Sequence, residues 1–304
     1  MHDGRRYRGA SGMSEHMLRT VAGGKIMNWR RGILVVLLSF LGAYLNANEI
    51  LAQSIWLEPL GDKEINLEII KPAFNEDGYL DADFTTFTLT YFLSGRFAFG
   101  ENSRIVGELP LAHAATDDGN DSDTAVGNLY LGAEFGQVRS GIQGDVGVRI
   151  PTASTDNIAS IVGAFSDYVD RVEAFLPEVL SVIAAGKYKY RSSEGVGLGV
   201  RLAPVLWIDT GDGGGDSTEL FVLYSLMAWY ESEVVGIGGG FSGRFFATVS
   251  DADFGQRTNH QLGVFANLTL GRWLPGVQLR VPLDEDLKDL LATEISFSIG
   301  VKLD

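Results

Sequence analysis

The chain has 304 residues, of which 45% are hydrophobic and 21% charged, and its formal net charge is −15 at pH 7. This length fits one large β domain or two ordinary domains. Because the chain has no cysteine, disulfides, thiolate nucleophiles and Cys-ligated metals are excluded. The acidic balance argues against nucleic acid as a partner, since binding to phosphates needs a basic surface.

The N-terminal segment predicts export. Arg30 and Arg31 precede an apolar run over 33–45, which is the layout of a secretory signal peptide. The run is too short for a comfortable transmembrane helix. We therefore expect residues 1–53 to hold an over-extended start and a signal peptide, and residues 54–304 to form the mature domain. An uncleaved N-terminal anchor is the alternative.

The mature region alternates between apolar and polar residues. In the final segment, every second residue from Ile295 to Leu303 is apolar, and those between are Ser, Gly or Lys. Alternate residues of a strand point to opposite faces, so this pattern predicts a strand with one apolar and one polar face. Segments of this kind are expected at 62–71, 84–99, 103–114, 125–136, 141–150, 179–191, 195–209, 218–231, 233–249, 259–270, 276–283 and 292–303.

Long and short connections alternate between these strands. The long connections are 72–83, 115–124, 151–178, 210–217, 250–258 and 284–291, and the others are tight turns. Long loops at one end and short turns at the other are typical of an outer-membrane barrel. The sequence therefore predicts an all-β fold, an antiparallel up-and-down transmembrane β-barrel of about 12 strands, with a range of 10–14. A soluble secreted β-sandwich is the alternative fold.

The longest connection, 151–178, is expected to contain a helical turn around 166–175 and to fold over or into the barrel mouth. Its acids Asp167, Asp170 and Glu173, like the other acids of the long connections, are expected on a solvated face. A sharper hypothesis is that the acidic loops meet lipopolysaccharide phosphates through divalent cations.

Charged side chains within the strands fall on the less apolar face. A charge at the lipid midplane costs roughly 2–4 kcal/mol, so these residues should point into the barrel. Strand 218–231 is apolar on both faces, which leaves its phase open. The predicted pore-lining residues are Arg96, Arg104, Glu108, Glu134, Asp145, Arg149, Lys187, Lys189, Arg201, Arg244, Arg280, Glu294 and Lys302.

Bases outnumber acids in this set, which predicts acidic loops and a basic interior. Two interpretations follow. The bases and acids pair and plug a small barrel, or the bases form a narrow passage that favours anions. Aromatic residues near strand ends are expected in the interfacial girdles; these are Trp56, Tyr188, Tyr190, Trp207, Trp229, Tyr230 and Trp273.

Catalytic chemistry has little support in the sequence. Only His113 and His260 follow the signal segment, and neither has a Ser two residues further along. The acidic segment 117–123 lacks the ligand spacing of an EF-hand. We therefore expect no catalytic residues, no metal site and no cofactor; an enzyme would have to depend on His113 or His260.

The segments 127–135, GNLYLGAEF, and 144–152, GDVGVRIPT, carry a family resemblance. They resemble the MetA-pathway-of-phenol-degradation family of outer-membrane transporters, in which one strand begins with Gly-Asp and another ends in Pro-Thr-Gly. Here Asn128 stands in place of the Asp and Ala153 in place of the Gly. The resemblance implies passage of small, often hydrophobic or aromatic compounds.

The sequence thus favours a channel or facilitated-diffusion transporter in a Gram-negative outer membrane. Its expected partners are outer-membrane lipid, lipopolysaccharide and small solutes, either anions or small organic compounds. The alternative is a closed structural barrel that acts through acidic extracellular loops. Trimeric and monomeric barrels share the same alternation, so the oligomeric state stays open.

Overall fold

The computed structural model describes residues 63–75, 87–116, 122–137, 140–154, 157–211, 218–248 and 254–303. The predicted signal peptide over 1–53 lies outside these residues, as do Trp56 and parts of several long connections. The division into 1–53 and 54–304 therefore stays a prediction. Within the described ranges, no helix is long and apolar enough to cross a membrane.

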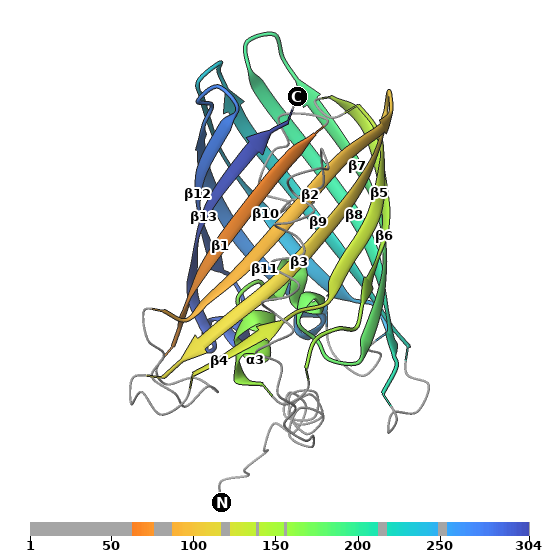
Figure 1. The fold of residues 1–304 in the computed structure, drawn as a ribbon, viewed down its shortest axis with the longest axis vertical. Coiled ribbons are helices and arrows are strands. Elements are labelled where there is room, and N and C mark those ends of the chain that lie inside the picture. The colour runs from red at the N-terminus through yellow and green to blue at the C-terminus, as the bar shows by residue number, and fades with distance from the viewer. Residues whose placement is uncertain are drawn as a thin grey trace, which may run out of the picture.

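The strands form one antiparallel sheet that closes on itself (Figure 1). β1 pairs with β2 on one side and with β13 on the other, which completes the ring. The strands are β1 (Glu64–Phe74), β2 (Leu89–Gly100), β3 (Ser103–Ala115), β4 (Ser122–Val126), β5 (Leu129–Gly136), β6 (Gly141–Ile150), β7 (Val179–Arg191), β8 (Val196–Asp209), β9 (Thr218–Glu231), β10 (Val235–Phe246), β11 (Thr258–Leu268), β12 (Trp273–Pro282) and β13 (Leu291–Lys302).

β4 and β5 share one place in the ring. β4 pairs with β3 from Leu111 to Ala115, and β5 pairs with β3 from Ser103 to Glu108. They therefore act as one strand with a break after Val126, and the closed barrel has 12 strands. This confirms the predicted fold class and contradicts the β-sandwich.

The outer wall of the barrel is apolar. On β13, Phe297 is 58% exposed and Ile299 51%, whereas Ser296 and Ser298 between them are buried inside. Closure pairs the backbone groups of every strand with a neighbour, so an apolar outer face is compatible with lipid. The interior then receives the polar side chains.

The two ends of the barrel differ. The short turns and the end of β13 lie at the top of Figure 1, which we call the turn end; the opposite end is the loop end. Tyr188, Tyr190, Tyr230 and Trp273 are exposed near the turn end, as expected for an aromatic girdle. The girdle prediction is wrong for Trp229, which is only 6% exposed on the inward face of β9. It is also wrong for Trp207, which packs inside on Phe221 with ring centroids 4.0 Å apart.

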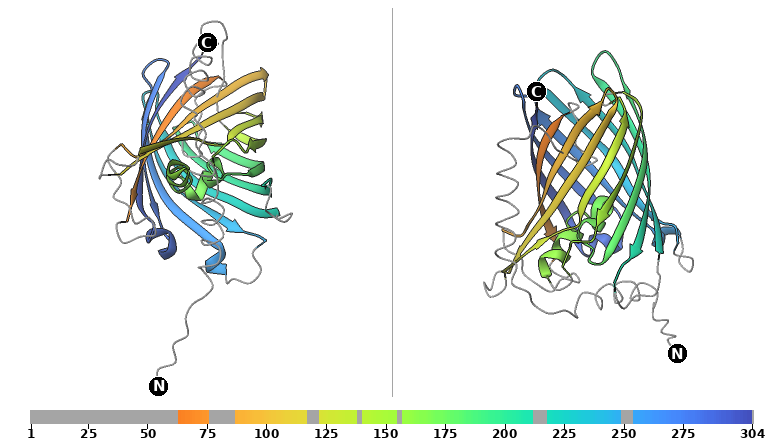
Figure 2. Two further views of the ribbon diagram at one scale, coloured as in Figure 1. Left: turned by 60° about the horizontal axis from the view of Figure 1, so that its bottom comes forward. Right: turned by 45° about the vertical axis from the view of Figure 1, so that its right-hand side comes forward.

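The connection between β6 and β7 folds into the barrel, where both views of Figure 2 show its helices within the ring of strands. It contains α3 (Ile158–Phe165), α4 (Tyr168–Arg171) and the 3-10 helix η1 (Val172–Ala174). We call residues 157–176 the plug. The other described helices, η2 (Phe254–Arg257) and α5 (Glu285–Lys288), lie in connections at the loop end.

The first helix of the plug, α3, begins at Ile158, before the helical turn that the sequence predicts around 166–175. The Asn157 side chain accepts a hydrogen bond from the backbone N–H of Ala159 and so caps α3. The helix then packs its small and apolar residues on Ile70, Phe92 and the alanines of β3. The sequence left open whether this connection folds over the barrel mouth or into it. Burial of these apolar side chains against the inner wall favours the position inside the barrel.

Candidate functional site

Arg171 is the cation of the plug and faces β1, β2 and β3. Its Nη2 donates to Glu68 Oε2 at 2.6 Å and its Nη1 to Glu108 Oε2 at 3.1 Å. The guanidinium carbon lies 3.6 Å from the centroid of the Phe92 ring, so the cation also contacts an aromatic face. Two carboxylates and a ring therefore enclose one charge on this side of the interior.

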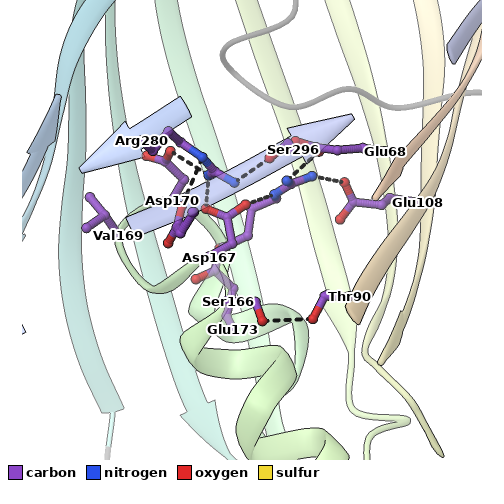
Figure 3. Close-up of polar contacts among 12 residues, drawn as sticks. Glu68, Thr90, Glu108, Ser166, Asp167, Val169, Asp170, Glu173, Arg280 and Ser296 are labelled. Carbon is purple, nitrogen blue, oxygen red and sulfur yellow. Dashed lines mark hydrogen bonds and ion pairs between the residues drawn. The ribbon is translucent and has the colours of Figure 1, made fainter. Parts of the chain in front are cut away.

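The carboxylates of the plug face β10, β11 and β12 (Figure 3). Asp167 Oδ1 accepts from Arg280 Nη1 at 2.6 Å, and Asp170 Oδ2 accepts from the Gln261 amide at 2.6 Å. Charge-assisted bonds of this length are among the stronger hydrogen bonds in proteins. On the same side, Arg244 Nη2 donates to Glu173 Oε2 at 2.7 Å, and Arg280 Nε forms an ion pair with Glu294 Oε2 at a distance of 2.9 Å.

The plug also pairs its own charges. Arg171 Nε donates to Asp167 Oδ2 at 2.5 Å across one helical turn. Burial alone would raise the pKa of the Asp167 carboxyl, but the Arg171 and Arg280 guanidinium groups lower it below its ordinary value. Burial alone would lower the pKa of Arg171, but the carboxylates of Asp167, Glu68 and Glu108 raise it well above its ordinary value. Both shifts favour the charged forms, the carboxylate of Asp167 and the guanidinium of Arg171.

Asn128 binds both the segment that precedes the plug and the C-terminal end of the plug. Its Oδ1 accepts from the backbone N–H groups of Thr152 and Ala153, both at 2.9 Å. Its Nδ2 donates to the carbonyls of Glu173 at 2.9 Å and Leu176 at 2.6 Å. Gly127 is needed beside it, because a Cβ there would lie 2.3 Å from the Ala174 carbonyl oxygen. The break between β4 and β5 is therefore the attachment point of the plug, and it coincides with the segments that carry the family resemblance.

The predicted pore-lining residues divide into two groups along the barrel. Each lies on the inward side of its strand, where it is buried or half-buried. At the loop end, Arg149 Nη2 donates to Glu108 Oε1 at 2.5 Å, beside the plug. The loop-end group is Glu108, Arg149, Arg244, Arg280 and Glu294, and the turn-end group is Arg96, Arg104, Glu134, Asp145, Lys187, Lys189, Arg201 and Lys302.

The turn-end charges pair along the wall rather than with the plug. Glu134 accepts from Arg96 at 2.8 and 3.0 Å, and Asp145 lies 2.9 Å from Lys187 Nζ. Arg201 differs, since no described carboxylate lies within ion-pair distance of it and its Nε is buried without a hydrogen-bond partner. Bases outnumber acids in this part of the interior.

A cavity of about 550 Å³ opens at the turn end. Arg191 and Lys302 contribute positive charge to its wall, and Glu194, Glu231 and Glu233 contribute negative charge. Arg191 Nη2 lies 3.1 Å from Glu231 Oε2, so part of this charge is paired. The cavity makes the turn end wide and polar, in contrast to the filled loop end.

Sequence reasoning missed most of the plug site. Asp167, Asp170 and Glu173 were expected on a solvated face, and that expectation is wrong, because all three are buried in the barrel. Glu68 and Arg171 were not singled out. One local signal was available: Asp167 and Arg171 are spaced i, i+4, with Tyr168 and Val169 between them, a pattern that suits an ion pair on a partly buried helix.

The two histidines make side-chain contacts that differ in kind. His113 Nδ1 lies 3.1 Å from Thr124 Oγ1. His260 Nε2 lies 2.7 Å from Tyr224 Oη, and its Nδ1 lies 3.0 Å from Asp284 Oδ1. This chain joins β9, β11 and the start of the α5 connection. The three linked side chains, Tyr224, His260 and Asp284, include no serine, so they differ from the serine–histidine arrangement of a hydrolase.

A closed ring of antiparallel strands, with an apolar outer wall and a polar interior, defines an outer-membrane β-barrel. Solved structures share this fold. The COG4313 outer membrane channel from Pseudomonas putida F1 has a TM-score of 0.57 at 12% identity, over 83% of this chain and 100% of that chain.

Two other similar structures have lower scores. The NanC porin has a TM-score of 0.46 at 7% identity, over 79% of this chain and 98% of that chain. LpxR from Salmonella typhimurium has a TM-score of 0.44 at 9% identity, over 79% of this chain and 100% of that chain. No protein-family model and no curated protein matches the sequence, so the resemblance to the MetA-pathway family stays a prediction.

Proposed function

We propose that this protein is an outer-membrane channel for small solutes, with an interior that favours anions and a plug that closes its loop end. The observation that carries the proposal is the excess of bases at the turn end, where Arg201 has no described carboxylate partner. Rings of Arg or Lys in a pore favour anions. The outer wall would contact lipid, and the acidic connections at the loop end would face lipopolysaccharide.

The plug gives a direct test, because the chain has no cysteine of its own. Thr90 Oγ1 and Ser166 Oγ lie 2.9 Å apart, one on the wall and one on the plug. The double variant Thr90→Cys/Ser166→Cys should therefore form a disulfide that locks the plug. Each single variant is the control.

The measurement is planar-bilayer conductance of the full chain under a salt gradient. We expect the oxidised double variant to be silent and the reduced form to show discrete current steps with an anion-biased reversal potential. Current through the oxidised form would show that the plug does not close the passage. A cation bias in the reduced form would remove the role assigned to the bases.

A closed structural barrel is the second candidate function. The complete pairing of Arg171, Asp167 and Glu173 with the wall favours it, because paired buried charges hold a plug firmly. This candidate predicts silence from both the oxidised and the reduced double variant in a folded, inserted sample.

A further inference from the structure

The wall residues that contact the charges of the plug lie in two groups of strands, one on each side of β13. Glu68 and Glu108, with the Phe92 ring, enclose the cation of the plug on β1, β2 and β3. Arg280 and Arg244, with Gln261, hold its carboxylates on β10, β11 and β12. We call these six wall residues the split-charge seat. A ligand of one charge sign can satisfy only one side of it.

The seat offers more hydrogen-bonding capacity than the plug uses. On the anion side, Arg244 Nη1 is buried with no hydrogen-bond partner among the described residues. Between the two sides, the amide of Gln278 on β12 donates to Glu68 Oε1 at 3.3 Å, while the buried Gln278 Oε1 accepts no bond from any described residue. An unused donor thus lies on the side that binds carboxylates, and an unused acceptor lies beside the carboxylates that bind the cation.

The charges of the plug indicate the size of a matching ligand. Arg171 and Asp167 touch each other at 2.5 Å while each also binds the wall. A guanidinium and a carboxylate that are side by side therefore reach both sides of the seat. A solute the size of an amino acid or dipeptide, with one cationic and one carboxylate group, has the same charges at a similar spacing.

We propose that the split-charge seat is a binding site for small solutes that carry both a cation and a carboxylate, and that such solutes compete with the plug for it. The inference rests on the proposed channel function and names the solute class that would open the loop end. Neighbouring opposite charges on one solute bind both sides at once, which gives it an advantage over separate ions.

The test measures how fast a thiol placed in the plug becomes accessible to a labelling reagent. Ser166 is fully buried, so in the full-length Ser166→Cys variant the only thiol of the chain is protected while the plug is docked. The rate of labelling by a charged maleimide, in detergent micelles, measures undocking. The probe is acetyl-Arg-Asp-amide, and the control is an equal mixture of acetyl-Arg-amide and acetyl-Asp-amide at the same ionic strength.

A tethered plug has a local concentration of roughly millimolar or more, so the probe is needed at about 100 mM. We expect the linked probe to raise the labelling rate about threefold or more above the unlinked mixture, because only the linked probe gains the second contact without a second binding cost. Glu68→Gln or Arg244→Gln should remove this difference, whereas Lys288→Gln, on the exposed α5, should leave it intact. Equal rates with the linked and unlinked probes would overturn the inference.

The outcome separates the two proposals. Labelling needs no current, so a silent barrel still tests the seat. A barrel that conducts, but whose Cys at position 166 responds equally to both probes, would retain the channel function and lose the split-charge site.

Discussion

At the loop end of the interior, wall charges contact the plug as well as one another, whereas at the turn end they pair only along the wall or have no described ion-pair partner. Arg280 and Arg244 each bind a carboxylate from another part of the chain, but Arg96 and Lys187 bind carboxylates of nearby strands. The same residue types thus hold the plug at one end and line the polar interior at the other. An interior base is therefore informative about ion preference only when its partner is known.

The largest effect should come from Arg171→Met, which keeps an apolar side chain over Phe92 but removes the charge. The carboxylates of Glu68, Glu108 and Asp167 would lose their shared partner in a buried site. Removing one partner of a buried ion pair costs about 3–5 kcal/mol, so the plug should undock. Labelling of the Ser166→Cys background by a charged maleimide measures this.

A matched control for that variant lies at the turn end. Arg191→Met also removes one Arg from an ion pair, the 3.1 Å pair with Glu231, but this pair is far from the plug and partly exposed. It should leave labelling unchanged, because exposed pairs contribute about 0–1 kcal/mol. Equal acceleration by both variants would mean that the two ends of the barrel are not independent.

Asn128→Ala should have the next largest effect. It removes four hydrogen bonds, two to the segment before the plug and two to the C-terminal end of the plug, without changing any charge. At about 0.5–1.5 kcal/mol each, their loss should weaken docking by roughly 2–6 kcal/mol.

Amide hydrogen exchange can show whether Asn128→Ala destabilises only the plug or the whole barrel. Exchange should accelerate across 157–176 while the amides of β7 and β8 stay protected. Asn267→Ala, at the turn end, is the control. Uniform acceleration in all strands would instead make Asn128 a determinant of the whole barrel.

Arg201→Glu should change ion preference without moving the plug. Arg201 has no described carboxylate partner, so its reversal adds negative charge to the turn end and breaks no ion pair. A unit charge about 8 Å away contributes roughly 0.5 kcal/mol in water, so the anion-to-cation permeability ratio should fall roughly twofold to fivefold. Reversal potentials in a plug-released background would measure this, with Arg201→Gln giving an intermediate value. An unchanged ratio would remove Arg201 from the ion pathway.

The contrast between the two ends also explains how far the sequence could be interpreted. Strand alternation was readable because it records a boundary between lipid and a polar interior. It failed on β9, where Phe221, Leu223 and Trp229 point inward. Phe221 and Leu223 belong to an apolar cluster formed by neighbouring strands, and Trp229 packs on Met227 and Phe265. The inner face of β9 is therefore as apolar as its lipid face, and the sequence signal disappears.

The plug site itself could not be assembled from local patterns. Arg171 binds Glu68 over a separation of 103 residues and Glu108 over 63. Those pairings depend on which strands lie opposite the inserted segment, and no spacing along the chain encodes that. The inward charges were predictable because charge in lipid is costly, but the identity of their partners was not.

The smallest expected effect is that of pH, and it distinguishes ion-pair docking from a titrating switch. The pKa of Asp167 is lowered in the folded protein, so its contribution to docking is present above its ordinary pKa. That contribution is lost only as pH falls through the lowered value. Labelling of the Ser166→Cys protein should therefore stay constant, after correction for thiol reactivity, from neutral pH down to about pH 4, the ordinary range for Asp. Release of the plug already between pH 7 and pH 5 would contradict docking through the Asp167 ion pairs.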